Sequence, residues 1–216
     1  MAEKNEMEKY YAKRASEYEE IYAKPERQES IKESKELLKN YFRGKNVLEI
    51  ACGTGYWTEP ISEVSANILA TDLNNEVLEI ARSKKYGSRV DFIQDDSYVL
   101  DKIQTKYDSL FAGFWLSHVP KAKLKNFIEV VHGKLNNHAM VVFMDNLYVH
   151  GSSTPISRTD EEGNTYQIRK LKDNSQHEVL KNFYTENSLR DFFENYGKEV
   201  EIHNLTYFWL IKYIRK

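Results

Sequence analysis

The chain has 216 residues, enough for one domain with a sizeable core, and its 31 Lys and Arg nearly balance its 33 Asp and Glu, for a net charge of −2. This balance leaves no basic footprint for a nucleic-acid backbone, so nucleic acid is not an expected partner. Apolar runs too short for a bilayer, an N-terminus without a secretory signal and a single cysteine, Cys52, favour a cytoplasmic protein without membrane spans, disulfides or a cysteine-based zinc site.

Strands and helices are predicted to alternate along the first two thirds of the chain. A helix is expected over residues 26–42, where apolar side chains recur at helical spacing. Asn74 is a candidate N-cap for a later helix. The pattern predicts, in order, strand 46–51, helix 56–64, strand 67–73, helix 75–85, strands 89–94 and 107–115, helix 123–135 and strand 139–145.

This alternation is typical of a Rossmann-like, doubly wound sheet with helices on both faces. Since right-handed crossovers are nearly obligatory, the first strand should lie centrally, with a ligand over the carboxyl ends of the strands. After Asp145 the pattern changes: residues 158–171 suggest a turn between extended segments, 185–197 a capped helix and 200–215 two strands. We expect a seven-stranded, mostly parallel sheet with an antiparallel C-terminal strand.

The segment VLEIACGTGYWT, residues 47–58, combines a strand with a glycine-rich loop and an acidic strand end. A dinucleotide loop needs a small third residue in G-x-G-x-x-G, but from Gly53 and Gly55 that position is Thr58, and Glu49 would face two phosphates. A Walker loop lacks its Gly-Lys-Ser/Thr. The carboxylate favours a phosphate-free ligand with positive charge, and S-adenosylmethionine fits that description.

The same segment resembles the first motif of the class I S-adenosylmethionine-dependent methyltransferases, although Ala51 stands where that family usually has its first glycine. LATDLN, FIQDDS and YDSLFAGFWLSHVP resemble the later segments of this family, so the resemblance covers roughly residues 10–145. It implies S-adenosylmethionine as cofactor and S-adenosylhomocysteine as product. The cofactor-binding residues that it implies are Tyr11, Arg14, Tyr18, Glu49, Ala51, Gly53, Gly55, Asp72, Leu73, Asp96, Ser97 and Trp115.

The resemblance also implies a role for each acidic position. Asp72 would accept hydrogen bonds from both ribose hydroxyls, with Leu73 beside the adenine. Asp96 would accept from the adenine amino group, with its neighbour Asp95 as the alternative, and the Ser97 N–H would face a ring nitrogen.

The N-terminal segment, residues 10–30, resembles the lead-in of small-molecule methyltransferases, in which a helix covers the cofactor. Arg14 would pair with the cofactor's carboxylate, and Tyr11 or Tyr18 would donate to it. The alternative is a surface helix whose two tyrosines pack on the core.

Methyl transfer needs a base only where the acceptor must first lose a proton. His118, after the fourth predicted strand, is the candidate catalytic base, and the alternative is a histidine that hydrogen-bonds a loop backbone. His150 and His177 are weaker candidates. The pair Asp145–Asn146 resembles that of metal-dependent catechol methyltransferases, but no acidic residue ends the fourth strand, so no metal is expected.

Residues 147–186 are expected to form the acceptor side and to recognise a polar or anionic small molecule, the alternative being an exposed hairpin with ordinary charges. The candidate residues there are Ser152, Ser153, Arg158, Arg169, His177 and Lys181. The predicted organisation is a single domain, 1–216, with a helical cap (1–44), a cofactor-binding core (45–145), a substrate-side insertion (146–184) and a C-terminal helix with strands (185–216).

The predicted function is methyl transfer to an O or N atom of a small polar molecule by a monomer or homodimer. Two alternatives stay open: a catalytically silent S-adenosylmethionine-binding or regulatory protein on the same fold, and a protein methyltransferase.

Overall fold

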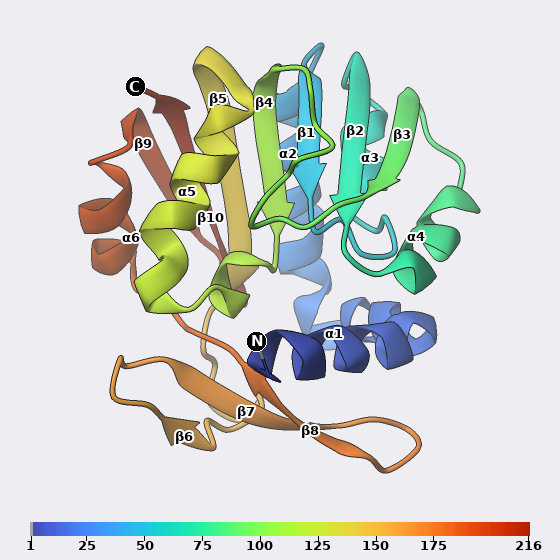
Figure 1. The fold of residues 1–216 in the computed structure, drawn as a ribbon, viewed down its shortest axis with the longest axis vertical. Coiled ribbons are helices and arrows are strands. Elements are labelled where there is room, and N and C mark those ends of the chain that lie inside the picture. Colours follow the sequence, from blue (N-terminus) through green and yellow to red (C-terminus); the bar gives the residue numbers. More distant parts are fainter. Residues whose placement is uncertain (1) are drawn as a thin grey trace.

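The computed structural model describes residues 2–216, and its main sheet has seven strands in the order β3-β2-β1-β4-β5-β10-β9 (Figure 1). The mutually parallel strands are β1 (Asn46–Ile50), β2 (Asn67–Asp72), β3 (Arg89–Gln94), β4 (Tyr107–Gly113) and β5 (Leu135–Asn146). The antiparallel strand β10 (Phe208–Arg215) lies between β5 and β9 (Gly197–Asn204). The predicted sheet and its antiparallel C-terminal strand are confirmed.

Helices cover both faces of this sheet (Figure 1). On one face, Leu38, Phe42 and Ile61 are fully buried in a core beneath α2 (Gln28–Phe42) and α3 (Thr58–Ser62). On the other, Phe127 and Phe193 belong to the core beneath α5 (Leu124–Gly133) and α6 (Glu186–Phe193). The remaining helix of the alternation, α4 (Asn75–Arg82), packs against β2 and β3. Within the described chain, no helix is long and apolar enough to cross a membrane.

The helix ends show where local sequence signals succeed and fail. Thr185 caps α6 as expected, in a reciprocal capping box with Ser188. Asn74 occupies the N-cap position of α4, but its side chain makes no capping hydrogen bond. Its backbone N–H instead donates to Asp72 Oδ1 at 2.9 Å. The loop therefore binds the strand-end carboxylate, and the predicted cap is wrong in its bonding though not in its place.

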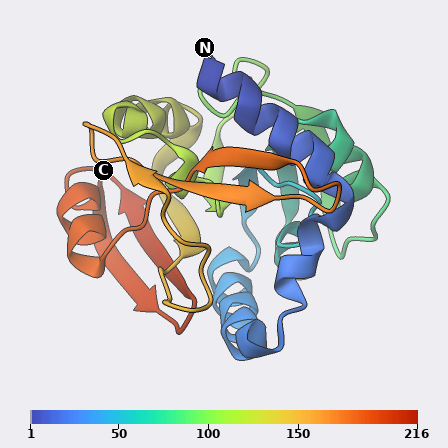
Figure 2. The same cartoon turned by 90° about the horizontal axis from the view of Figure 1, so that it is seen from below.

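A second, three-stranded sheet lies beyond the carboxyl ends of the parallel strands (Figure 1). Its strands are β6 (Arg158–Thr159), β7 (Thr165–Lys170) and β8 (Gln176–Leu180), and they confirm the extended segments expected around the 160–164 turn. The N-terminal strap, which we define as α1 (Ala2–Arg14) and the 3-10 helix η1 (Ala15–Tyr22), lies alongside β7 and β8 (Figure 2). Tyr10 of the strap packs there against Leu171 and Val179.

Two non-glycine residues adopt left-handed backbone conformations at neighbouring strand ends. Ala51 follows β1 with φ 53°, and Phe114 follows β4 with φ 58°. This conformation costs a residue with a Cβ atom about 1–2 kcal/mol. Such strain gathers at functional sites, and both residues line the cavity between the strand ends and the strap.

Candidate functional site

The strand-end pocket opens at the carboxyl ends of β1, β2 and β4, beneath the N-terminal strap. Asn74, Val77, Tyr98 and Phe114 line it as well, although sequence reasoning did not single them out. The predicted cofactor-binding residues that line it are Tyr11, Tyr18, Ala51, Gly53, Asp72, Leu73, Asp96, Ser97 and Trp115.

Asp72 organises the centre of this pocket. Its Oδ2 accepts the Gly53 N–H at 2.9 Å, and its Oδ1 accepts the Asn74 N–H at 2.9 Å. Burial raises the pKa of Asp72, and these backbone hydrogen bonds lower it in part. Because a carboxylate oxygen has two lone pairs, each oxygen keeps capacity for one further donor from a ligand.

The neighbouring acidic pair divides its roles. Asp95 is buried, and its two oxygens accept the backbone N–H groups of Asp96 (2.9 Å) and Lys102 (3.2 Å), so it braces its own loop. Asp96 lies at the pocket wall, where its Oδ1 accepts the Tyr98 N–H at 3.0 Å. Both carboxylates line the pocket, and Asp95 is the more deeply buried of the two.

Three predicted cofactor residues lie outside the strand-end pocket. Gly55 shapes the loop with φ 78°, and a Cβ there would collide with the Tyr86 hydroxyl. Arg14 donates to the Tyr10 hydroxyl at 3.0 Å and lines a different cavity. Glu49 lies beside a small adjoining cavity, where its buried Oε2 has no hydrogen-bond partner among the described residues and burial raises its pKa to about 8. A cationic group would satisfy this carboxylate.

A second cavity of about 470 Å³ lies between the strap, the chain after β5 and the second sheet, and we call it the basic pocket. Two acidic residues also border it, but Glu20 forms an ion pair with Lys172, and Glu17 accepts the Lys172 N–H at 3.4 Å. The cationic residues that line the pocket are Arg14, Lys24, Arg27, Arg169, Lys170 and Lys181.

The two pockets share a wall. Tyr11, Tyr18, Phe114 and His118 line both cavities, so a ligand in one pocket would lie next to a ligand in the other. We call this shared wall the junction.

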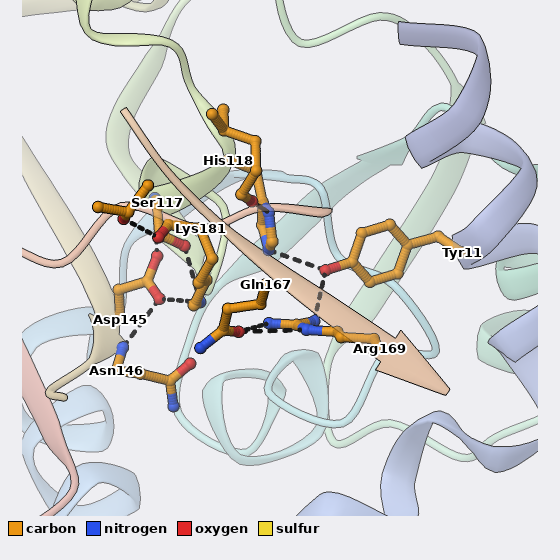
Figure 3. A network of polar contacts seen from close by, with 10 residues as sticks. Tyr11, Ser117, His118, Asp145, Asn146, Gln167, Arg169 and Lys181 are labelled. Carbon is orange, nitrogen blue, oxygen red and sulfur yellow. Dashed lines mark hydrogen bonds and ion pairs between the residues drawn. The ribbon is translucent and has the colours of Figure 1, made fainter. Parts of the chain in front are cut away.

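The hydrogen bonds of His118 determine its tautomer. Its Nδ1 lies 2.6 Å from the Leu180 carbonyl oxygen, which can only accept, so Nδ1 carries the proton. Its Nε2 therefore accepts from the Tyr11 hydroxyl, 2.8 Å away (Figure 3). Burial, with the nearby Lys181 and Arg169 charges, holds the pKa of His118 well below its usual value, so the ring is neutral.

Arg169 completes this group at the junction (Figure 3). Its Nη1 lies 3.4 Å from the Tyr11 hydroxyl, and its Nη2 donates to Gln167 Oε1 at 3.1 Å. These partners are neutral, and no ion pair within the described chain includes Arg169. Burial raises the pKa of Tyr11, so the phenol is also neutral.

Lys181 is different because its charge is matched inside the protein. Its Nζ lies 2.7 Å from both Asp145 Oδ1 and Ser117 Oγ, and its side chain is 3% exposed. Burial lowers the pKa of Lys181 to about 8. Asp145, considered above as part of a metal site, is this lysine's counter-ion, and no metal-binding group of three or more His, Cys, Asp or Glu occurs among residues 2–216.

This sheet order, with carboxylates at the strand ends and a second cavity beside them, is that of the Rossmann-like fold of class I S-adenosylmethionine-dependent methyltransferases. The residues of the chain fit the cofactor, since the unpartnered Glu49 suits a cationic group and Asp72 can take two further donors. Residues 47–138 match the family described as "Methyltransferase domain".

Two curated proteins illustrate the sequence similarity. The Ubiquinone biosynthesis O-methyltransferase of Proteus mirabilis (strain HI4320) is 36% identical over 81 residues, which are 36% of this chain and 33% of that protein. The Demethylmenaquinone methyltransferase of Lactococcus lactis subsp. lactis (strain IL1403) is 29% identical over 83 residues, again 36% of this chain and 33% of that protein. The chain thus spans about a third of the length of these curated relatives.

Solved structures match nearly the whole chain. The DhpI–SAH complex is 27% identical, with a TM-score of 0.76 over 94% of this chain and 92% of that chain. The DhpI–SAM–HEP complex, at 23% identity, has a TM-score of 0.79 over 99% of this chain and 98% of that chain, which shows the shared fold.

Proposed function

We propose that the chain is an active enzyme that transfers the methyl group of S-adenosylmethionine to an oxygen of a small anionic molecule in the basic pocket. The observation that carries this proposal is Arg169, a half-buried guanidinium at the junction whose hydrogen-bond partners are neutral. A cation in this setting gains most from an anionic ligand, and a guanidinium matches the geometry of a carboxylate or phosphonate.

The strand-end pocket would hold the cofactor. Asp72 would accept from the ribose hydroxyls, because each of its oxygens has one lone pair beyond the loop N–H groups. Asp96 would take the adenine amino group, with Asp95, which also lines the pocket, as the alternative. Burial raises the pKa of Glu49 to about 8, and the positive charge of a bound methionyl part would favour its ionised form.

S-adenosylmethionine, when bound, supplies an electrophilic methyl carbon: the acceptor oxygen forms the C–O bond while the C–S bond breaks and sulfur keeps its electron pair. An oxygen that is already ionised needs no base. His118 and Tyr11 are both neutral and hydrogen-bonded to each other, which supports an acceptor that arrives ionised. In this proposal His118, the candidate base of the sequence analysis, becomes a positioning residue that holds Tyr11 and, through it, Arg169.

The relatives support a small acceptor in general terms. Two of them are, by name, methyltransferases of ubiquinone biosynthesis and of demethylmenaquinone. The family match ends at residue 138, before the segment that borders the basic pocket. The anionic character of the acceptor therefore rests on the pocket of this chain.

The test begins with cofactor binding and proceeds to transfer. Calorimetry should show binding of S-adenosylmethionine and S-adenosylhomocysteine, and radiolabelled methyl groups should pass to members of a metabolite panel. The panel pairs each carboxylate or phosphonate with its neutral amide or ester, and label should enter only the anionic members. Binding without any transfer would support a silent cofactor-binding protein, and labelling of the neutral partners alone would refute the anionic acceptor.

A further inference from the structure

The basic pocket is lined by a second cationic side chain without an ion-pair partner in the part of the chain that the structure describes, Arg27, which lies apart from Arg169. Arg27 ends the 3-10 helix η2 (Pro25–Arg27), just before α2. Its Nη2 donates to Ser152 Oγ at 3.5 Å, its guanidinium lies over the Tyr207 ring, and its buried Nε has no partner in the described chain. Among the side chains that the structure describes, none forms an ion pair with Arg27. Its charge is therefore also available to a ligand.

The turn after β5 places a hydroxyl beside this guanidinium. The N–H groups of Ser152 and Ser153 donate to the Val149 carbonyl at 3.1 and 2.8 Å, and Ser153 Oγ accepts the Val149 N–H at 2.9 Å. These bonds hold the turn and leave Ser152 Oγ as the acceptor from Arg27, with its own proton available for donation to a ligand. Figure 2 shows this stretch of chain beside the start of α2.

Gln167 keeps the two cationic positions apart. It is buried, its Nε2 donates to the Thr154 carbonyl at 2.5 Å, and its Oε1 accepts from Arg169 at 3.1 Å. The Gln167 amide thus links the Arg169 guanidinium to the segment of chain that contains Ser152 and Thr154. Arg27 and Arg169 therefore contact different parts of the pocket wall, which Gln167 connects.

Apolar side chains also contribute to the wall of this pocket. Ile21, Phe114 and Phe183 line the basic pocket, and its volume of about 470 Å³ is in the range of small-molecule sites. An aliphatic spacer between two anionic groups would pack on these side chains.

We propose that the acceptor carries two anionic groups joined by a short apolar spacer. One group lies against Arg169 at the junction and receives the methyl group, and the other lies against Arg27 and Ser152. The first group loses one negative charge as its oxygen forms the C–O bond and the C–S bond of the sulfonium breaks, and the second group keeps its charge. This inference rests on the proposed function and adds the substrate class: α,ω-dianions such as dicarboxylates and phosphonocarboxylates.

The test measures binding to the chain saturated with S-adenosylhomocysteine, by calorimetry at constant ionic strength. Succinate, glutarate, adipate and 3-phosphonopropionate are compared with the singly headed butyrate, pentanoate, hexanoate and propylphosphonate. At least one two-headed probe should bind about tenfold or more tightly than its partner, because it gains a second ion pair. Equal binding within every pair, or no binding of any two-headed probe, would overturn the inference.

Two variants test which arginine is responsible for the tighter binding of the two-headed probes. Arg27→Gln should remove the advantage of the two-headed probe and leave the single-headed affinity unchanged, whereas Arg169→Gln should weaken both. Arg89→Gln, which removes the same charge from an exposed ion pair with Asp91, is the matched control and should change neither. An equal loss for both probe types in Arg27→Gln would show a general effect on the pocket and refute the second subsite.

The cofactor measurement separates the two proposals. If S-adenosylhomocysteine does not bind, the proposed function itself fails. If it binds and single-headed anions depend on Arg169, but no two-headed probe is preferred, only the second subsite is wrong.

Discussion

The two pockets of this protein are built in opposite ways. The strand-end pocket takes most of its polar groups from short side chains and backbone at the ends of neighbouring parallel strands. The basic pocket depends on long side chains from segments far apart in the sequence: Arg27 and Ser152 are 125 residues apart, and Tyr11 and Arg169 are 158 apart. The first pocket is therefore a property of the sheet, and the second is a property of how the strap and second sheet pack over it.

Because of this difference, the two pockets should respond differently to substitutions. Backbone donors such as the Gly53 N–H keep their place as long as the sheet is folded. The guanidinium of Arg169 keeps its place only through Gln167 and Tyr11. Changes at strand ends should therefore affect cofactor binding, and changes in the strap or second sheet should affect acceptor binding.

The largest expected effect is on the strand-end pocket. Asp72→Ala should weaken S-adenosylhomocysteine binding at least about 100-fold, because charge-assisted hydrogen bonds are worth about 1.5–3 kcal/mol each and this change removes several. Calorimetry measures the loss, and circular dichroism checks that the variant is folded. Asp91→Ala, which removes an exposed carboxylate of β3, is the control. Unchanged affinity in Asp72→Ala would place the ribose elsewhere.

The next largest effect is a pH dependence of anion binding, which should be confined to the basic pocket. With its pKa at about 8, Lys181 loses its proton as pH rises from 7 to 9, so the basic pocket loses one positive charge and Asp145 loses its counter-ion. Butyrate or glutarate binding should then weaken roughly tenfold across this range. Lys181→Met should bind weakly at every pH and show no such step. A flat titration of the unmodified chain would contradict the assignment.

A smaller effect is expected at the junction. His118→Gln breaks the bond to Leu180 and loosens Tyr11, and we expect about a tenfold fall in kcat/KM with an unchanged pH profile. A catalytic base would instead contribute about 100-fold to 10,000-fold and would determine one limb of that profile. Tyr11→Phe breaks the same contact from the other side, so the double variant should lose little more than either single one.

The smallest effect concerns strain. Ala51→Gly should stabilise the protein by up to about 1 kcal/mol, because glycine adopts the φ of 53° without steric cost but loses more chain entropy on folding. Thermal unfolding would then shift upward by about 2–4 °C for a chain of this size. Ala112→Gly, within strand β4, should destabilise it instead. Destabilisation by both changes would show that the strain at Ala51 is negligible.

The strand-end pocket was largely predictable because its residues follow strands that the apolar pattern reveals. Asp72 and Asp96 stand where a local motif places them, and the structure brings both to one cavity. Asn74 occupies the expected N-cap position of α4, but its side chain makes no capping hydrogen bond, and its backbone N–H binds Asp72. Local propensity cannot show such a neighbour.

The basic pocket was predictable only in its general character. The charges of residues 147–186 indicated a polar or anionic ligand, but not that Arg169 would contact Tyr11 at the junction or that Lys181 would pair with Asp145. Arg158 was predicted to be an acceptor-side residue like Arg169 and Lys181, but it forms a surface ion pair with Glu178. Arg27 gave no signal at all, because it lies in a helix start remote in sequence from the turn that it meets. Only tertiary packing distinguishes these cations.

The junction has a thermodynamic consequence. Because Tyr11 and Tyr18 belong to the walls of both pockets, ordering them for one ligand alters the free energy of binding the other. Linkage makes this coupling reciprocal: whatever factor the cofactor contributes to acceptor affinity, the acceptor returns to cofactor affinity. In the proposed reaction, methylation would remove one negative charge from the acceptor and leave a thioether in place of a sulfonium, so electrostatic attraction would hold both products less strongly than the substrates.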